Sequence, residues 1–338
     1  PMNRPGMTAA LAVALLGALA ALALGRLAAS RLEGVARDLR RLADLDLESV
    51  PDRSPVLAEA AGLAAAVSRA RDRLDVFRRF LPAPLVRTLA RSGAMDRAPE
   101  PAECSLLLAR LDHTPAGVRP ADVLEAVEEA VRGAQGMAFA AGEGRMAALW
   151  NQPVPAPDHP YLACSAALVL LRALDAARER EADGTGPIPL HLGIHSGSMR
   201  AGVGGSRRLV SFGVDADALA TAERLAAAAR LYGVGCVLSR SARELVRERV
   251  VVRVLDLFLL PGSDRPVPVY ELVGARGQLS DRTLEYVRLY ESGLSRLFRG
   301  ECKEAAKLLL AAHKLRPRPE DASCTLLLKR CIQGGRKV

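Results

Sequence analysis

Lysine is missing from the first 302 residues of this 338-residue chain, and all five lysines lie at or after Lys303. The positive charge is carried almost entirely by arginine, and the formal net charge is +9. The arginines stand singly or in pairs along the chain, and aromatic residues make up only 4%. Nucleic-acid-binding surfaces cluster basic residues on one element and interleave aromatic side chains. We therefore expect no nucleic-acid partner, because charge spread in this way is typical of a solvated surface.

Cysteine and histidine are also sparse, and their spacing excludes several kinds of site. No CxxC pair or metal-ligand spacing occurs among the six cysteines, which are Cys104, Cys164, Cys236, Cys302, Cys324 and Cys331. A reducing cytosol would keep all six as thiols. His191 and His195 stand four apart on a predicted strand, roughly 13 Å by the rise per residue, which is too far to share a metal. No serine lies in a nucleophile elbow.

The one long uncharged apolar run is Met7–Gly25, close to the ~20 residues that a helix needs to cross a bilayer. A signal peptide is the alternative, but the run exceeds the usual apolar region and a charged helical segment follows it directly. We predict a single-pass anchor in the inner (cytoplasmic) membrane after a short overhang, residues 1–6. Arginines follow the run more densely than they precede it, which predicts that the C-terminal side is cytoplasmic.

Residues 26–99 carry the heptad-like spacing of a seam between helices. One seam comprises Leu32, Val35, Leu39 and Leu42, and a second comprises Leu63, Val67, Ala70, Leu74, Phe77 and Leu81. Two short amphipathic helices around an extended connector resemble a shortened HAMP-type relay, and a plain coiled-coil stalk is the alternative. Both predict a parallel homodimer.

From residue 100 to 275 the pattern changes to alternating strands and helices. Strands are expected at 105–111, in a hairpin over 137–150, at 188–196 and up to 212, followed by terminal strands. Helices are expected at 120–133, 161–180 and 216–230, and a glycine-rich turn at 202–205. This order predicts a mixed α/β layer fold.

The tail, residues 280–338, is helical and rich in alanine and leucine. Gly293, Ala305, Ala312 and Pro317 have the mutual spacing of a tetratricopeptide unit, although a generic helical hairpin fits equally well. One such unit does not bury its own face, so we expect it to pack on the preceding domain or on a protein partner.

Three stretches carry a resemblance to a known family. They are ALWNQPVPAPDHPYLACSAALVLLRAL (148–174), HLGIHSGSMRAGVGGSRRLVSFGVDADALATAERLAAAARLYGVGCVL (191–238) and LDLFLLPGSDRPVPVYELV (255–273). Together they resemble the catalytic domain of class III adenylate and guanylate cyclases. Residues 77–93 (FRRFLPAPLVRTLARSG) are similar to the linker before many membrane-bound bacterial cyclase domains. The resemblance implies a ferredoxin-like fold of the α/β (α+β) class for residues 100–275.

In that family two aspartates hold the two metal ions that activate the 3′-hydroxyl and neutralise the triphosphate. The resemblance places Arg110 at the first position and Gly144 at the second, with Glu143 at the family's glycine. A strand shifted by two residues would present Asp112 on the same face instead, which leaves Asp112 as an alternative ligand. Glu143 is one residue off and would face the other way.

The partner half of such a site uses a lysine for the base, an asparagine for the ribose and an arginine for the transition state. The resemblance places Ala140, Ala220 and Arg224 at these positions, so only the arginine is retained. A surface arginine on an amphipathic helix is the equally good alternative for Arg224. The glycine-rich turn at 202–206 lacks the lysine that follows the glycines of a P-loop, so we interpret it as a hairpin turn and not as a phosphate-binding loop.

These observations predict a membrane-anchored, dimeric, degenerate cyclase-like protein without cyclase activity that acts in signalling, regulation or scaffolding. No metal or cofactor is expected. One alternative is an active adenylate cyclase that uses Mg²⁺ or Mn²⁺ with ATP, through Asp112 or as half of a heterodimeric site. Another is a sensor that binds a nucleotide without turnover.

Overall fold

The computed structural model divides into two compact units, residues 1–92 and 93–338, which are described separately. In the second unit it describes residues 100–115, 117–180, 188–205, 210–319 and 321–333. In the first it describes helical pieces at 13–23, 25–26, 29, 33, 36–37, 39–40, 62 and 65–73.

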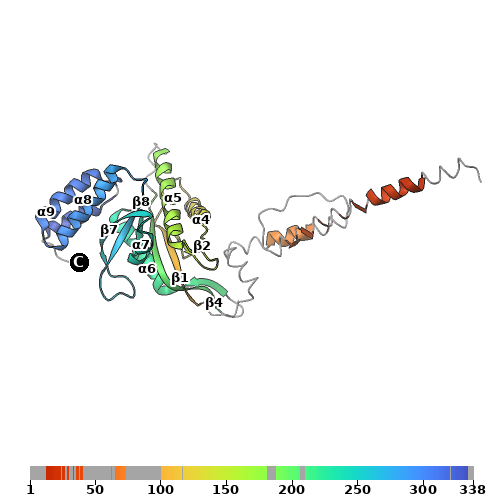
Figure 1. The fold of residues 1–338 in the computed structure, drawn as a ribbon, viewed down its shortest axis with the longest axis horizontal. Helices are drawn as coiled ribbons and strands as arrows, with labels where there is room; N and C mark the ends of the chain where they lie inside the picture. The colour runs from red at the N-terminus through yellow and green to blue at the C-terminus, as the bar shows by residue number, and fades with distance from the viewer. Residues whose placement is uncertain are drawn as a thin grey trace, which may run out of the picture. The chain divides into compact units, whose positions relative to one another are not determined.

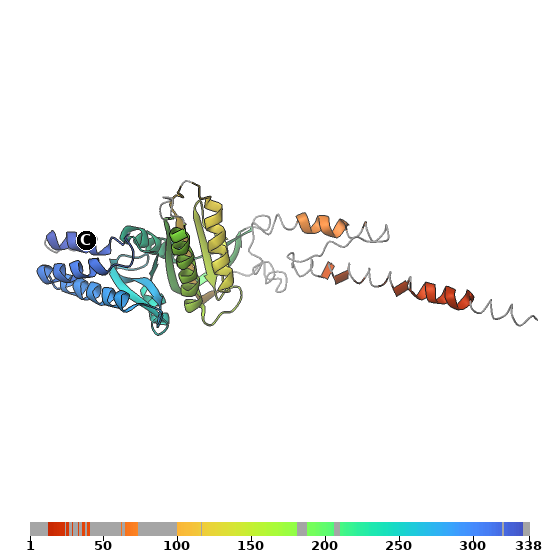
Figure 2. The same ribbon diagram turned by 90° about the horizontal axis from the view of Figure 1, so that it is seen from above.

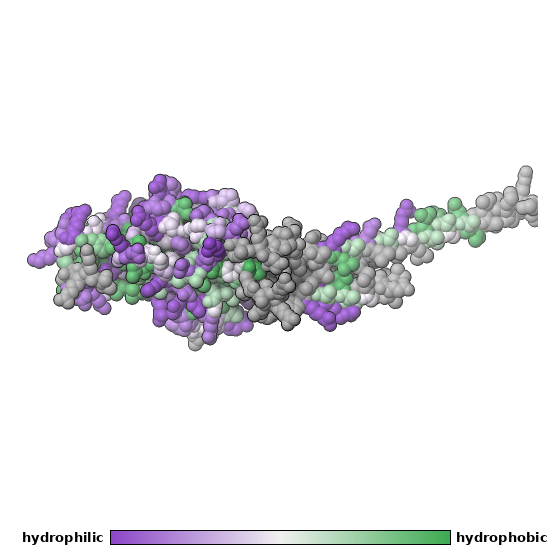
Figure 3. Space-filling view, turned by 90° about the horizontal axis from the view of Figure 1, so that it is seen from below, coloured by the Kyte–Doolittle hydropathy of each residue, from purple (hydrophilic) through white to green (hydrophobic). Residues whose placement is uncertain are grey.

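The first unit contributes an apolar helix, Val13–Ala23, which Figure 3 shows as a hydrophobic stretch. It covers part of the predicted span Met7–Gly25. In the helical piece 65–73 the side chain of Val67 is buried. The overhang 1–6, most of the HAMP-like stalk 26–99 and the linker 77–93 lie outside the described residues, so these assignments stay predictions.

The second unit is built on a mixed sheet (Figure 1). In the part of the chain that is described, the strands follow the order β2-β3-β1-β4-β6-β8-β7, and β5 pairs with the outer part of β4. Neighbouring strands are antiparallel except for β4 and β6. The bounds are β1 Pro101–Leu111, β2 Met137–Ala140, β3 Arg145–Trp150, β4 Leu190–Gly205, β5 Val210–Val214, β6 Cys236–Leu238, β7 Val250–Phe258 and β8 Val267–Ala275.

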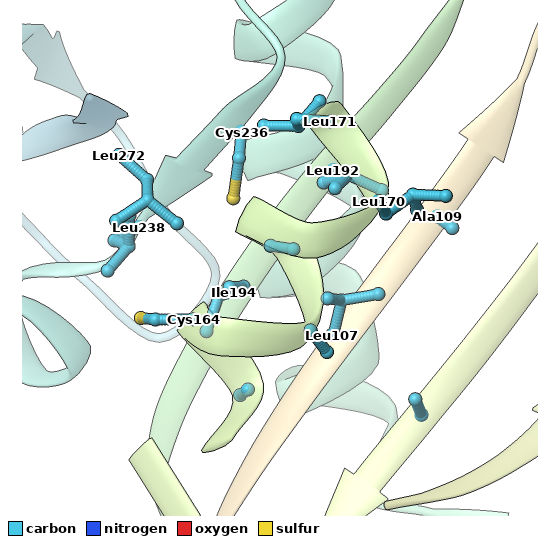
Figure 4. Close-up of a cluster of buried hydrophobic side chains, with 14 of the residues drawn as sticks. Leu107, Ala109, Cys164, Leu170, Leu171, Leu192, Ile194, Cys236, Leu238 and Leu272 are labelled. Atoms are coloured by element: carbon cyan, nitrogen blue, oxygen red, sulfur yellow. The ribbon is translucent and has the colours of Figure 1, made fainter. Parts of the chain in front are cut away.

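Helices α4 (Pro120–Gly133), α5 (His159–Arg180) and α7 (Arg240–Val246) contribute to the main core on one face of the sheet. Because strand side chains alternate, Leu107 and Ala109 of β1 point into this core, where they meet Cys164 and Leu170 of α5 (Figure 4). Among the described helices, α5 is long and apolar enough over His159–Ala177 to cross a membrane. Its packing against the sheet identifies α5 as a core helix of this domain.

Helix α6 (Ala216–Tyr232) covers part of the opposite face. It lies directly on β4 at Gly193, where an added Cβ would collide with the backbone of Ala222 and of Ala226. Leu225 and Ala229 bury the helix against the sheet, together with Leu255 of β7. Even-numbered residues at the end of β1 therefore point toward α6.

The tail folds into α8 (Asp281–Phe298), α9 (Cys302–Leu315) and α10 (Ser323–Ile332), seen beyond β7 in Figures 1 and 2. Helix α8 bonds to β7 at the edge of the sheet. The Tyr290 hydroxyl donates to the Leu255 carbonyl over 2.9 Å, and the Val254 amide donates to Glu291 Oε1 over 2.9 Å. These bonds satisfy edge groups that would otherwise be open to pairing with another chain.

A buried guanidinium fixes the tail to the sheet. Arg253 of β7 has no exposed surface and pairs with Glu271 of β8 and with Asp321 in the loop before α10. Its guanidinium also lies over the rings of Tyr286 and Tyr290 of α8, at 4.6 and 4.3 Å from their centroids. The tail helices and the sheet therefore share one polar core.

The predicted elements agree with the structure except at two places. The helix 120–133 is α4, and the helices predicted from 161 and 216 are α5 and α6. The turn expected at 202–205 is wrong, because β4 continues through Gly205 and these glycines pair with β5. Ladder hydrogen bonds to a partner strand hold a glycine-rich segment extended despite its low strand propensity. The short elements β6 and α7 were missed.

Candidate functional site

The two positions that correspond to the family's metal ligands lie side by side. Arg110 at the end of β1 is the cross-strand partner of Arg145 at the start of β3. The amide of Leu111 donates to the carbonyl of Gly144 over 2.8 Å. Arg110 and Gly144 thus occupy one end of the sheet, as their alignment predicts.

The side chain that the shifted register offers as a ligand, Asp112, is already paired. Its Oδ1 accepts from Arg110 Nε at 2.9 Å, and its Oδ2 lies 3.1 Å from Arg230 Nε on α6. The Asp112 side chain is 11% exposed. The ring nitrogen Nε2 of His191 on β4 lies 3.7 Å from Oδ2. Burial lowers the pKa of His191, so the imidazole is neutral at neutral pH.

Gly144 has a backbone that disfavours an aspartate. Its φ is +64°, in the left-handed region, and an added Cβ would lie 2.8 Å from the carbonyl oxygen of Leu111. A side chain at this position would be strained both by the backbone conformation and by this contact. A carboxylate ligand is therefore absent here, and the local geometry is that of a tight glycine turn.

Helix α6 is held over this end of the sheet by two ion pairs. Arg145 Nη1 lies 2.6 Å from Glu223 Oε1, and Arg230 pairs with Asp112 as above. Glu223 and Arg230 are seven residues apart and so lie on one face of the helix. We name Arg110, Asp112, Arg145, Glu223 and Arg230 the arginine–carboxylate cluster.

The arginine–carboxylate cluster does not fit a pair of divalent metal ions. Mg²⁺ requires hard oxygen ligands in near-octahedral geometry. Here each carboxylate is bound to a guanidinium, and three fixed positive charges lie where metal ions would have to approach. Within the described ranges, no group of three or more His, Cys, Asp or Glu side chains is placed to hold a metal ion.

The three positions of the partner half lie on two elements. Ala140 ends β2 and is exposed, and Ala220 lies in the first half of α6. Arg224 is exposed on α6 and forms no ion pair with any residue that the structure describes. Arg224 therefore has the surroundings of a surface arginine, and its role at the transition state stays a prediction.

Sequence reasoning missed the partners of Asp112 on α6 and a polar cavity beyond the start of that helix. Two signals for the cluster were available in the sequence. Arg110 and Asp112 are two residues apart at the end of a strand and so share a face, and Glu223 and Arg230 are seven residues apart on a helix. The cavity, of about 850 Å³, lies between β4, the starts of α6 and α7, and the β7–β8 connection.

The lining of this polar cavity includes His195, Arg200, Asp217, Ser239 and Glu244. His195 Nδ1 lies 3.1 Å from Ser239 Oγ, and burial lowers the pKa of this histidine. Both carboxylates and guanidiniums line the cavity, so its charge selects no single class of ligand.

Comparisons with known proteins agree with this fold. The chain is 27% identical over 281 residues to Adenylate cyclase 1 of Rhizobium meliloti (strain 1021), which covers 80% of this chain and 42% of that relative. No family model matches the chain. A bacterial light-regulated adenylyl cyclase superposes with a TM-score of 0.54 at 13% identity, over 71% of each chain. The adenylyl cyclase CyaB from P. aeruginosa superposes over 54% of this chain and 100% of that one, with a TM-score of 0.47 and 15% identity.

The resemblance to adenylate and guanylate cyclases that the motifs indicated is thus confirmed, and the α+β sheet fold is the one these domains share. The chain spans about two fifths of the length of the Rhizobium relative.

Proposed function

We propose that this protein is a membrane-anchored, cyclase-like signalling or scaffolding module that forms homodimers and makes no cyclic nucleotide. One observation carries the proposal. Asp112, the carboxylate that a shifted register would offer to a metal, is bound by Arg110 and Arg230.

Two further features support the loss of catalysis. The left-handed glycine turn at Gly144 offers no carboxylate, and Ala140 and Ala220 provide no polar contact for a base or a ribose. Since both metal ions are needed to activate the nucleophile and to neutralise the triphosphate, the loss of their ligands costs on the order of a thousandfold or more in rate.

The test is a cyclase assay on the full chain purified in detergent. ATP and GTP are each supplied with Mg²⁺ or Mn²⁺, and cyclic nucleotide is measured by mass spectrometry against a blank without protein. We expect no product above the blank. Metal-dependent turnover that disappears in Asp112→Ala would overturn the proposal and establish the shifted register.

A second experiment tests whether the missing metal ligands alone account for the loss of catalysis. The double variant Arg110→Asp with Gly144→Asp places a carboxylate at both of the family's metal positions. The second change also places a Cβ against the Leu111 carbonyl. We expect this double variant to stay inactive, because base and ribose contacts are still missing. Recovery of activity would mean that the two metal positions alone separate this chain from a working cyclase.

A heterodimeric enzyme is the remaining alternative, and it rests on Arg224. This side chain is exposed on α6 and free to reach across to a second chain. A half that supplies the transition-state arginine also needs the lysine and the asparagine, which Ala140 and Ala220 replace. The heterodimeric enzyme therefore accounts for Arg224 but not for Ala140 and Ala220, whereas the inactive module accounts for all three residues.

A further inference from the structure

Two of the six cysteines differ from the others in their surroundings. Cys104, Cys164, Cys236 and Cys324 are buried, whereas Cys302 and Cys331 are partly exposed. All six are free thiols in this structure. Only Cys302 and Cys331 are therefore open to reagents in water.

The fold brings these two thiols to the same end of the tail. Cys302 is the first residue of α9, and Cys331 lies in the last turn of α10. Helices α9 and α10 are consecutive and pack against each other, and Cys302 lies close enough to raise the pKa of the Cys331 thiol. Both cysteines pack against the same hydrophobic cluster, whose buried members include Leu294 and Leu309.

We propose that Cys302 and Cys331 form a reversible intramolecular disulfide when the protein meets an oxidising thiol couple. A Cys302 or Cys331 thiolate attacks one sulfur of glutathione disulfide and releases one glutathione thiolate. The second cysteine then attacks the mixed disulfide, forms the Cys302–Cys331 bond and releases the second glutathione. The two cysteines lose two electrons and two protons, and glutathione disulfide is reduced to two glutathione molecules.

The bond would fix the attachment of the tail to the sheet. Cys331 follows Arg330, whose guanidinium binds Asp256 of β7 and donates to the Tyr232 hydroxyl at the end of α6 over 3.0 Å. A disulfide at Cys331 therefore restrains the turn of α10 that reaches both the sheet and α6.

The reaction has a defined dependence on pH. Burial, with a smaller contribution from Cys302, raises the pKa of the Cys331 thiol. Because the thiolate is the nucleophile, disulfide formation should accelerate as the pH rises from neutral toward that pKa.

The test treats the full chain in detergent with glutathione disulfide, blocks remaining thiols with N-ethylmaleimide and digests the protein with trypsin without reduction. Cleavage after Arg299 and Lys303 releases GECK, and cleavage after Arg330 and Arg336 releases CIQGGR. We expect these two peptides joined by a disulfide, and their separation on reduction. The oxidised protein should also unfold at a temperature higher by on the order of 5 °C.

Cys302→Ser and Cys331→Ser are the matched controls, since each removes one partner by an isosteric change at a partly exposed site. Each should abolish the joined peptide and the rise in unfolding temperature. Glutathione on both cysteines of the wild type without the joined peptide would overturn the proposal. So would a Cys302–Cys331 link found only between chains, which migrates as a covalent dimer on a non-reducing gel.

Discussion

At the scale of single residues, the pairing of Asp112 decides what the cyclase-like site can do. A carboxylate that is free to bind Mg²⁺ would have to give up Arg110 and Arg230, and the two guanidiniums would remain beside the metal. A catalytic carboxylate and an ion-paired structural carboxylate differ in one measurable way. Removing the structural one lowers stability even when no metal or nucleotide is present.

We expect Asp112→Ala to destabilise the domain by roughly 1–2 kcal/mol, because two partly exposed guanidiniums lose their counter-charge. Thermal unfolding of the full chain in detergent measures the change. Glu285→Ala is the matched control, since its pair with Arg288 is far more exposed and should contribute well under ~1 kcal/mol. Equal unfolding temperatures for both variants would contradict the structural role of Asp112.

Buried histidines make the stability of the domain depend on pH. Burial lowers the pKa of His159, which bonds to Ser105, and of His195, which bonds to Ser239. The unfolded chain therefore binds protons at a higher pH than the folded one, and stability falls as the pH drops through the unfolded value of about 6.5.

We expect the unfolding temperature to fall between about pH 7.5 and about pH 5.5 and to level off below the folded pKa values. His195→Gln should show a smaller fall than the wild type over the same range. Circular dichroism melts at each pH measure both. A wild type whose unfolding temperature rises on acidification in this window would refute the assignment.

At the scale of elements, the sequence predicts most of the fold and only part of the site. The apolar run of β1 and the boundaries of α4 follow from local patterns, which explains why they were predictable. The pairing of Asp112 with Arg230 depends on how α6 crosses β4 at Gly193, and no local pattern encodes that crossing. The continuation of β4 through Gly205 depends in the same way on pairing with β5.

The tail and the sheet form one structural element through Arg253. We expect Arg253→Met to cost about 3–5 kcal/mol, because Glu271 and Asp321 are left buried without their counter-charge. Chemical denaturation monitored by circular dichroism measures the loss. Arg288→Met, at a side chain that is 78% exposed, is the control and should change stability little. If both variants unfold alike, the buried cluster does not hold the tail.

At the scale of the whole molecule, the predicted stalk precedes a domain with the fold of an adenylyl cyclase. The seam that includes Val67 and Leu74 predicts that the stalk pairs with a second copy, since apolar residues at this spacing form the contact between paired helices. Val67 is buried within the first unit, and Leu74 lies outside the described residues.

We expect the full chain in detergent to be a dimer and Val67→Glu with Leu74→Glu to be a monomer, because charges at seam positions oppose helix pairing. Light scattering coupled to size exclusion gives the mass of each protein. Ala66→Glu, off the seam, is the control and should leave the dimer intact. An unchanged mass for the seam variant would show that the stalk is not the dimer contact.

The most direct measurement is equilibrium dialysis of the full chain in detergent against Mn²⁺ with a non-hydrolysable ATP analogue. The arginine–carboxylate cluster leaves no free oxygen ligands for a metal pair, so we predict equal Mn²⁺ concentrations on the two sides of the dialysis membrane. Asp112→Ala should behave as the wild type does. An excess of one or two Mn²⁺ per chain on the protein side, lost in Asp112→Ala, would show that Asp112 is a metal ligand and would contradict the proposal.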